Sequence, residues 1–254
     1  MRMKGNTIFI TGGSSGIGKG LAEAFHKLGN QVIIAGRRED RMLGICDANP
    51  GMKYWFLDVT DRASIQKVAA EVIDEFPGLN CVINNAGLQK VHNLVGEPPL
   101  DDAGMMEEIS ANLVGAIRVA AAFVPHLSKA KEAVLVNVSS GLAFVPLARY
   151  PVYCATKAAV HSFTLSLRYQ LNGVGVKVIE LIPPFVRTEL GGEWKYAEVE
   201  RRGAPPPMPL DEFISEAMSE LAGDADEVAV GESKKMLGAT SLDTVKRVFA
   251  GMNH

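Results

Sequence analysis

The sequence predicts an α/β protein with a three-layer, doubly wound fold, in which helices cover both faces of a seven-stranded parallel sheet. Short apolar runs alternate with longer segments of helical periodicity along most of the chain. Most of these runs are apolar at consecutive positions, as expected for strands that are buried on both faces. Together the two patterns favour a succession of βαβ units.

The strands are expected at seven short apolar runs, of which the last is the weakest: residues 7–10, 31–35, 54–57, 81–83, 133–138, 176–182 and 228–230. Helical periodicity fills most of the intervals, with its clearest stretches at residues 16–28, 101–127, 153–171 and 211–221. The closing residues 242–252 predict either an amphipathic helix at an interface or a frayed tail.

One domain, residues 1–254, is expected for a chain of 254 residues. Residues 187–209 break the rhythm, because Gly191-Gly192 and Pro205-Pro206-Pro207 cannot continue a helix. The aromatic residues Trp194 and Tyr196 lie between these two breaks. A stretch of this length without regular structure predicts a substrate lid, with surface packing of the aromatic residues as the alternative.

Composition argues against several kinds of partner. Lys and Arg number 26 against 29 Asp and Glu, and the net charge of −3 disfavours nucleic acid and anionic membranes. The three cysteines are isolated in sequence, which suits a reducing compartment. No signal peptide is visible, and the weakly polar residues 113–127 are interrupted by Arg118 and Pro125. We therefore expect a cytoplasmic protein with no membrane or nucleic-acid partner.

The histidines show no spacing typical of metal ligands, so no metal is predicted. Each is expected at the surface or in packing: His26, His92, His126, His161 and His254.

A glycine-rich segment, Thr11-Gly12-Gly13-Ser14-Ser15-Gly16-Ile17-Gly18, follows the first predicted strand and opens the first predicted helix. Glycine lets the backbone turn tightly and approach a pyrophosphate, while the free N–H groups at the helix N-terminus attract the anion. The segment therefore predicts a dinucleotide site. A glycine-rich turn without a ligand is the alternative.

The end of the second predicted strand indicates which dinucleotide binds. Units that take NAD commonly carry an acidic residue there, which accepts a hydrogen bond from the ribose 2′-OH. Here Arg37 and Arg38 stand in its place, and guanidinium groups pair well with a 2′-phosphate. NADP is therefore preferred over NAD, unless Glu39 and Asp40 neutralise arginines that only solvate a loop. Asp58 is expected either to accept a hydrogen bond from the adenine amino group or to lie at a helix N-terminus.

Tyr153 is the only one of the five tyrosines with a lysine four residues later, Lys157. On a helix this spacing places both side chains on one face. A tyrosine hydroxyl ionises at about pH 10, and an adjacent ammonium group lowers this pKa because it stabilises the phenolate. A positively charged, oxidised nicotinamide would act in the same direction.

Polar residues that accompany this pair are expected at the carboxyl edge of the sheet, where open α/β sheets bind their ligands. Ser139 and Ser140 end the fifth predicted strand, and Asn84-Asn85-Ala86-Gly87 ends the fourth. Asn112 lies within a helical pattern, where a buried amide needs a hydrogen-bonding role.

These motifs, in this order and approximate spacing, resemble the classical short-chain dehydrogenase/reductase family over at least residues 7–188. The resemblance implies a Rossmann-type fold and a catalytic set of Asn112, Ser140, Tyr153 and Lys157. In that family the serine orients the carbonyl or alcohol and the tyrosine passes the proton. The lysine lowers the tyrosine pKa and holds the nicotinamide ribose, and the asparagine supports a water that links the lysine to solvent. Ser140 is preferred to Ser139 by the family's usual interval before the tyrosine.

The motifs and the resemblance together predict the cofactor contacts Gly12, Ser14, Ser15, Gly16, Ile17, Gly18, Arg37, Arg38, Asp58, Val59, Asn85, Ala86, Gly87, Tyr153, Lys157, Pro183, Val186 and Thr188. One departure is Pro183-Pro184, where the family often has Pro-Gly, and the second proline is expected to stiffen the loop over the nicotinamide. This feature, with residues 208–213 and 228–231, is similar to the DltE-like subgroup, named after the D-alanyl–lipoteichoic acid operon.

The sequence thus predicts an oxidoreductase that moves a hydride between the nicotinamide of NADP, with NAD as the alternative, and a small-molecule carbonyl or secondary alcohol. Tyr153 is expected to act as the general acid/base. A non-catalytic NADP-binding redox sensor or scaffold is the first alternative. An epimerase or dehydratase acting on a nucleotide sugar is a second, although the chain leaves little length for a larger substrate domain.

A largely apolar substrate pocket is expected between Leu88, Leu142, Phe144, Tyr150, Phe185, Trp194 and Tyr196. The helices at residues 101–127 and 153–171 are apolar over more than one face. Because such helices pair between subunits in the resembled family, a homodimer or homotetramer is expected, with coverage of the sheet alone as the alternative.

Overall fold

The computed structural model describes residues 1–95, 100–190, 192, 196, 201, 206–239 and 242–253. Seven parallel strands form one sheet in the order β3-β2-β1-β4-β5-β6-β7. The strands are β1 (Thr7–Thr11), β2 (Gln31–Gly36), β3 (Lys53–Phe56), β4 (Cys81–Asn84), β5 (Ala133–Val138), β6 (Val176–Ile182) and β7 (Glu227–Ala229). The predicted three-layer, doubly wound Rossmann fold is confirmed.

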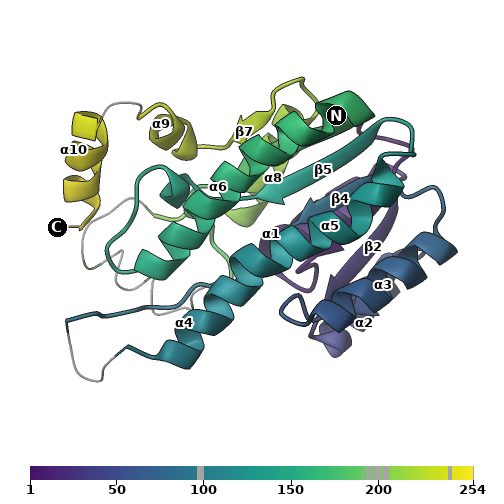
Figure 1. Ribbon diagram of the computed structural model, residues 1–254, viewed down its shortest axis with the longest axis horizontal. Coiled ribbons are helices and arrows are strands. Elements are labelled where there is room, and N and C mark those ends of the chain that lie inside the picture. The colour runs from purple at the N-terminus through teal and green to yellow at the C-terminus, as the bar shows by residue number, and fades with distance from the viewer. Residues whose placement is uncertain are drawn as a thin grey trace.

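Helices cover both faces of this sheet. One layer contains α1 (Gly16–Lys27), α2 (Glu39–Ala48) and α8 (Leu210–Leu221). The other contains α3 (Arg62–Glu75), α5 (Ala116–Leu127) and α6 (Pro151–Leu171), which lie on the viewer's side in Figure 1. The chain winds outward from β1 to β3 and then from β4 to β7, so the winding reverses between β1 and β4.

The side chains of β1 show why the strands are apolar at consecutive positions. Ile8 and Ile10 belong to the core under α1 and α8, whereas Phe9 belongs to the core on the opposite face. The Phe9 ring packs on Phe123 of α5, with 4.8 Å between ring centroids. All three strand residues are fully buried, so both faces of β1 contribute apolar burial to folding.

The helix expected at residues 101–127 has a π-helical turn in its middle. It consists of α4 (Asp102–Ile109), the π-helical turn η1 (Ser110–Gly115) and α5. By length and composition alone, this one run of the described residues is apolar enough to cross a membrane. A core helix passes the same test, and here Val119, Phe123 and Leu127 are buried in the core.

Shorter elements complete the carboxyl edge of the sheet and the end of the chain. They are the 3₁₀ turns η2 (Gly141–Ala143) and η3 (Asn172–Val174) and the helices α9 (Ser233–Leu237) and α10 (Leu242–Asn253). Figure 1 shows α10 set to one side of the sheet, beyond α9. The expected closing helix is therefore present, whereas β7 begins one residue earlier than predicted.

The segment expected to form a lid, residues 187–209, is described only in part, and Trp194 lies outside the described residues. At its start and end, Val186 and Met208 form an isolated parallel bridge. The Tyr196 ring stacks on Phe185, with 6.0 Å between centroids, and its hydroxyl donates to the carbonyl of Thr188. The described part of this segment is thus tied to the chain that follows β6.

Candidate active site

A cleft with a volume of about 1620 Å³ lies at the carboxyl edge of the sheet. A pocket for one small ligand typically occupies about 300–1,000 Å³, so this cleft has room for a dinucleotide and a second molecule. All but two of the predicted site residues line it, the exceptions being Gly18 and Asn112. Of the expected pocket walls, Leu88, Leu142, Tyr150 and Phe185 line the cleft.

Two other expected pocket walls do not line the cleft. Phe144 packs edge-on against His161, with 4.7 Å between ring centroids. Tyr196 stacks on Phe185. For these two side chains the structure favours the alternative of packing within the protein.

The glycine-rich turn between β1 and α1 forms one end of the cleft. Gly12 has a φ of 69°, and a Cβ there would lie 2.8 Å from Ala86 Cα. A Cβ on Gly18 would lie 2.4 Å from the Gly12 carbonyl oxygen and from Asn85 Nδ2. Gly18 therefore acts by letting α1 approach the turn, although it does not line the cleft. Ser15 makes no side-chain capping bond, so the first N–H groups of α1 remain available to an anion.

Arginines cluster beside this turn. Arg38 donates from Nε and Nη2 to Ser14 Oγ, at 3.1 and 2.9 Å, and also to Ser15 Oγ. Its Nη1 donates to Glu189, as does Nη1 of Arg41, at 2.9 and 2.6 Å. Hydrogen bonds from Arg41 and Arg38 hold the pKa of Glu189 below its ordinary value. The site therefore already binds one carboxylate where an anionic group of a cofactor would be expected.

Arg41 was not predicted as a site residue. The available signal was its spacing, since it follows Arg38 by three residues at the start of α2 and so shares a helix face with it. Arg37, which was predicted, points elsewhere and pairs with Glu107 at 3.4 Å. Only the fold shows that Arg38 and Arg41, rather than Arg37 and Arg38, converge on one anion.

Asp58 lines the same cleft. Its Oδ1 accepts hydrogen bonds from Thr60 N and Oγ1, at 2.9 and 2.7 Å. Burial raises the pKa of this carboxyl, but the bonds from Thr60 and the charge of Arg37 outweigh burial and lower it. Asp58 does not cap a helix, because the N-cap of α3 is Asp61. The alternative of a helix N-terminal role is therefore wrong.

Tyr153, Lys157 and Ser140 meet at the other end of the cleft. Both α6 residues are buried, and Lys157 Nζ lies 5.7 Å from the centroid of the Tyr153 ring. Lys157 donates to the carbonyl of Val138, the last residue of β5, at 2.8 Å. Ser140 follows β5, caps η2 by accepting from Leu142 N at 3.1 Å, and is hydrogen-bonded to Tyr153. A hydroxyl pair and an ammonium group thus face one end of the cleft.

Burial dominates the electrostatics of this group. It raises the pKa of Tyr153, which the hydrogen bond with Ser140 lowers and the charges of Cys154 and Glu108 raise further. Burial also lowers the pKa of Lys157 to about 8. In the protein by itself the net direction for Tyr153 is therefore upward, because desolvation is the largest influence on its pKa.

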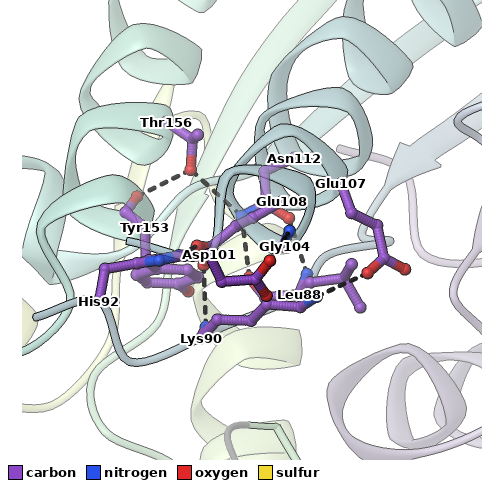
Figure 2. A network of polar contacts seen from close by, with 10 residues as sticks. All are labelled: Leu88, Lys90, His92, Asp101, Gly104, Glu107, Glu108, Asn112, Tyr153 and Thr156. Atoms are coloured by element: carbon purple, nitrogen blue, oxygen red, sulfur yellow. Dashed lines mark hydrogen bonds and ion pairs between the residues drawn. The ribbon is translucent and has the colours of Figure 1, made fainter. Parts of the chain in front are cut away.

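Asn112 has the hydrogen-bonding role that a buried amide needs, although it does not line the cleft. Its Oδ1 accepts from Leu88 N at 2.7 Å, and its Nδ2 donates to Leu88 O at 2.8 Å and to Thr156 Oγ1 at 3.1 Å. Figure 2 shows the amide between Leu88, in the chain that follows β4, and Thr156 of helix α6. The π-helical turn brings this side chain to the junction of three elements.

A second contact holds the same segment one turn earlier on the helix. Glu108 is fully buried and accepts from Lys90 N at 3.1 Å, while its other oxygen contacts His92 Nε2 at 2.8 Å. Figure 2 shows this pair beside Tyr153. His92 therefore has a specific buried partner, as does His161, which contacts Glu180 at 2.7 Å. His254 lies outside the described residues, whose His, Cys, Asp and Glu side chains include no cluster of three or more placed to bind a metal.

A model of the family described as short chain dehydrogenase matches residues 6–198, which is most of the chain. The protein belongs to this family and is an oxidoreductase. It is 40% identical, over 100% of its own length and 98% of the relative, to the uncharacterized oxidoreductase DltE of Bacillus subtilis. It is 34% identical to serine 3-dehydrogenase of Rhizobium radiobacter, over 72% of this chain and 73% of that protein.

Solved structures agree with this assignment. A short chain dehydrogenase from Burkholderia cenocepacia in complex with NADP superposes with a TM-score of 0.82 at 26% identity, covering 99% of each chain. The closed form of serine dehydrogenase complexed with NADP⁺ gives a TM-score of 0.78 at 25% identity, covering 88% of this chain and 94% of that one. The predicted family and its likeness to DltE are confirmed.

Proposed function

We propose that the protein transfers a hydride between the nicotinamide of NADP and a carbonyl or secondary alcohol carbon of a small molecule, with Tyr153 as the general acid/base. The observation that carries this proposal is the position of the Tyr153 hydroxyl. This hydroxyl is hydrogen-bonded to Ser140 and lies in the same cleft as the glycine-rich turn. Lys157 is one helical turn away on α6.

The residues present fit a dinucleotide. Gly12 and Gly18 stand where a Cβ would collide with Ala86 or the turn itself, so the backbone is kept bare at the place where a pyrophosphate needs close approach. Arg38 is fixed by Ser14 and Ser15 beside this turn, which favours the 2′-phosphate of NADP over NAD. Neighbours of the same fold are complexed with NADP, which supports the same choice here. NAD remains the alternative.

When it is bound, the nicotinamide carries the hydride, and the protein supplies position and charge. Ser140 and Tyr153 together hydrogen-bond the substrate oxygen, which fixes the reacting carbon beside the ring. In reduction Tyr153 donates its proton to that oxygen, and in oxidation it accepts the proton. The ammonium of Lys157 stabilises the phenolate, and in our proposal the positive charge of the oxidised cofactor reverses the effect of burial on the tyrosine pKa.

The remaining expectations become part of the same proposal. We take the chain as a single domain with a substrate lid at residues 187–209. We take it to work in the cytoplasm as a homodimer or homotetramer, without nucleic acid or membrane. The apolar side chains Leu88, Leu142, Tyr150 and Phe185 favour a hydrophobic aldehyde, ketone or alcohol.

The decisive experiment is turnover of NADPH with a panel of carbonyl compounds, in the wild type and in Tyr153→Phe. The variant should lose about 100-fold or more in kcat, because general acid–base assistance contributes about 10²–10⁴-fold. Its affinity for NADPH, followed by cofactor fluorescence, should change by less than about twofold. Tyr54→Phe removes a hydroxyl on β3, away from the cleft, and should leave both quantities unchanged.

Two results would contradict the proposal. Wild-type turnover in Tyr153→Phe would exclude this tyrosine as the acid/base. Binding of NADPH by the wild type without turnover of any carbonyl or alcohol would favour the redox sensor or scaffold.

A further inference from the structure

A row of polar residues crosses the sheet beneath α6. Asn84, Asn137, Glu180 and Glu227 pair in register across β4, β5, β6 and β7. Neighbours in register point to the same face of a parallel sheet, and here that face is the one that α6 covers. Such a row is unusual in the middle of a sheet that is otherwise apolar on both faces.

Helix α6 carries a polar stripe that faces this row. Lys157, His161, Thr164 and Arg168 follow one another at intervals of three or four residues and so share one face of the helix. Three of them contact the row: Thr164 Oγ1 accepts from Asn137 Nδ2 at 2.9 Å, His161 Nδ1 contacts Glu180 Oε2 at 2.7 Å, and Arg168 pairs with Glu227 at 2.5 Å. The stripe begins at the lysine of the proposed active site.

Glu180 differs from Glu227, the other charged member of the row. Its side chain is fully buried, and among the described residues its Oε1 has no hydrogen-bond partner. Its neighbour Glu227 carries the same charge but is matched by the guanidinium of Arg168. A buried carboxylate is costly unless a charge compensates it, so Glu180 requires a positive partner.

Two groups of α6 face Glu180. His161, whose side chain is about a quarter exposed, contacts Oε2 through Nδ1 at 2.7 Å. Lys157, one turn earlier, is buried and donates to the Val138 carbonyl of β5. The charge of Glu180 favours the ammonium form of Lys157, whereas burial opposes it and sets its pKa at about 8. From β5 the neighbour is the neutral Asn137, and from β7 it is Glu227, already paired.

We propose that Glu180, held in place by His161, is a positioning residue for Lys157. From the sheet beneath α6, the charge of Glu180 keeps this lysine protonated. The inference rests on the proposed function, in which the ammonium group stabilises the phenolate of Tyr153. Glu180 touches neither substrate nor cofactor, since it does not line the cleft. It acts only through the lysine.

The test is the pH profile of kcat/KM for NADPH-dependent reduction in Glu180→Gln. Loss of the carboxylate charge should move the alkaline limb to lower pH by about half a unit or more, because Lys157 then deprotonates earlier. On the neutral plateau, kcat and NADPH affinity should stay within about twofold of the wild type. Glu180→Asp keeps the charge and should keep the alkaline limb near its original position.

Glu227→Gln is the matched control. It removes a carboxylate from the same row and the same face of the sheet, but one whose partner is Arg168. The alkaline limb should stay in place in this variant. A uniform loss of rate at every pH in both glutamine variants, in step with lowered thermal stability, would show a merely structural role and overturn the inference.

A second readout does not depend on activity. In protein labelled at lysine ¹³Cε, the resonance of Lys157 can be assigned by its loss in Lys157→Met and titrated by NMR. Its pKa should fall in Glu180→Gln, and an unchanged titration in the folded variant would overturn the inference. Absence of any oxidoreductase activity in the wild type would instead contradict the proposed function and leave this titration able to decide the role of Glu180.

Should Glu180→Gln fail to fold, His161→Phe tests the same link. The buried carboxylate loses the side chain that holds it, so its charged form is less favoured and the pKa of Lys157 should fall relative to the wild type. A Lys157 titration that does not move in His161→Phe would also overturn the inference.

Discussion

Arg38 shows how a single residue prepares the cofactor site. Its guanidinium is fixed by Ser14 and Ser15 of the glycine-rich turn, and its remaining edge pairs with Glu189. A fixed, planar donor loses little rotamer freedom when an anion arrives, which suits recognition of a phosphate. The proposed preference for NADP therefore depends on Arg38 more than on Arg37, which is engaged with Glu107.

Arg38→Ala should weaken NADPH binding about 10-fold or more, because a charge-assisted hydrogen bond contributes about 1.5–3 kcal/mol. NADH, which lacks the 2′-phosphate, should lose less than about threefold. Fluorescence titration of both reduced cofactors measures the difference. Arg62→Ala, at the start of α3 and outside the cleft, is the control and should change neither affinity.

An equal loss for NADPH and NADH in Arg38→Ala would contradict this selectivity role. It would mean that Arg38 only supports the turn through Ser14 and Ser15.

The limits of residue-level prediction follow from sequence distance. Tyr153 and Lys157 were predictable because helix spacing places them on one face. Ser140 was predictable because it follows a strand and because the interval typical of the resembled family selects it over Ser139. The pairing of Glu189 with Arg38 was not, since 151 positions separate the two residues. Glu180 was missed for the same reason, because its burial depends on strands and a helix that come together only in the folded sheet.

Among the elements, the π-helical turn η1 has the most specific consequence. It places Asn112 where its amide bonds both backbone groups of Leu88, as a neighbouring strand would. A helix without the extra residue of a π turn would rotate this side chain away from Leu88. The turn therefore fixes the chain that follows β4 and forms one wall of the cleft.

Asn112→Leu should lower the free energy of unfolding by about 2–4 kcal/mol, because the hydrogen bonds of the buried amide to Leu88 and Thr156 are lost. Urea denaturation measures this loss, and amide hydrogen exchange at Leu88 should become faster. Ser110→Ala in the same π turn should cost less than about 0.5 kcal/mol. Equal losses in the two variants would show that the turn itself, rather than the amide of Asn112, carries the stability.

Periodicity predicted the existence of the strands and helices but not this turn. Residues 101–127 show one continuous apolar pattern, and an inserted π turn changes the phase of that pattern by too little to be read from a single sequence. Strand ends were predicted only to within one or two residues, because the apolar pattern reports burial rather than hydrogen bonding. For example, β7 was predicted at residues 228–230 and is found at Glu227–Ala229. The isolated bridge between Val186 and Met208 had no local signal in the sequence.

At the scale of the whole molecule, the reversal of winding between β1 and β4 places the cleft. The chain leaves these two neighbouring strands toward opposite sides, which opens a crevice at their carboxyl ends. Gly12 follows β1 and Asn85 follows β4, and Asn85 Nδ2 donates across the crevice to Thr11 O at 3.0 Å. The two halves of the sheet are thus joined at the point where the cofactor is proposed to bind.

The outer faces of α5 and α6 bear on the assembly of the molecule. Leu165 and Tyr169 on α6 are 43% and 88% exposed, and Ile117 on α5 is 37% exposed. We expect these faces to be covered by a second subunit, since single exposed apolar residues are common but an aligned set is less so. Light scattering should give a mass two or four times that of the chain.

The double substitution Leu165→Asp and Tyr169→Asp should yield a monomer, because like charges would then face each other across a symmetric contact. Val174→Asp, an exposed apolar residue in η3 beyond the end of α6, is the matched control and should leave the mass unchanged. A wild type that is monomeric at all concentrations would contradict the expectation and leave coverage of the sheet as the role of these helices.

The carboxylate of Glu189 between Arg38 and Arg41 has a consequence for how ionic strength affects the protein. A phosphate that binds these guanidiniums displaces the carboxylate of Glu189, so few bound counterions are released to solvent. Added salt screens the incoming phosphate but also loosens the resident ion pair, which is exposed enough to be screened. The dissociation constant for NADP should therefore rise less steeply with salt concentration than two newly formed arginine–phosphate contacts would require.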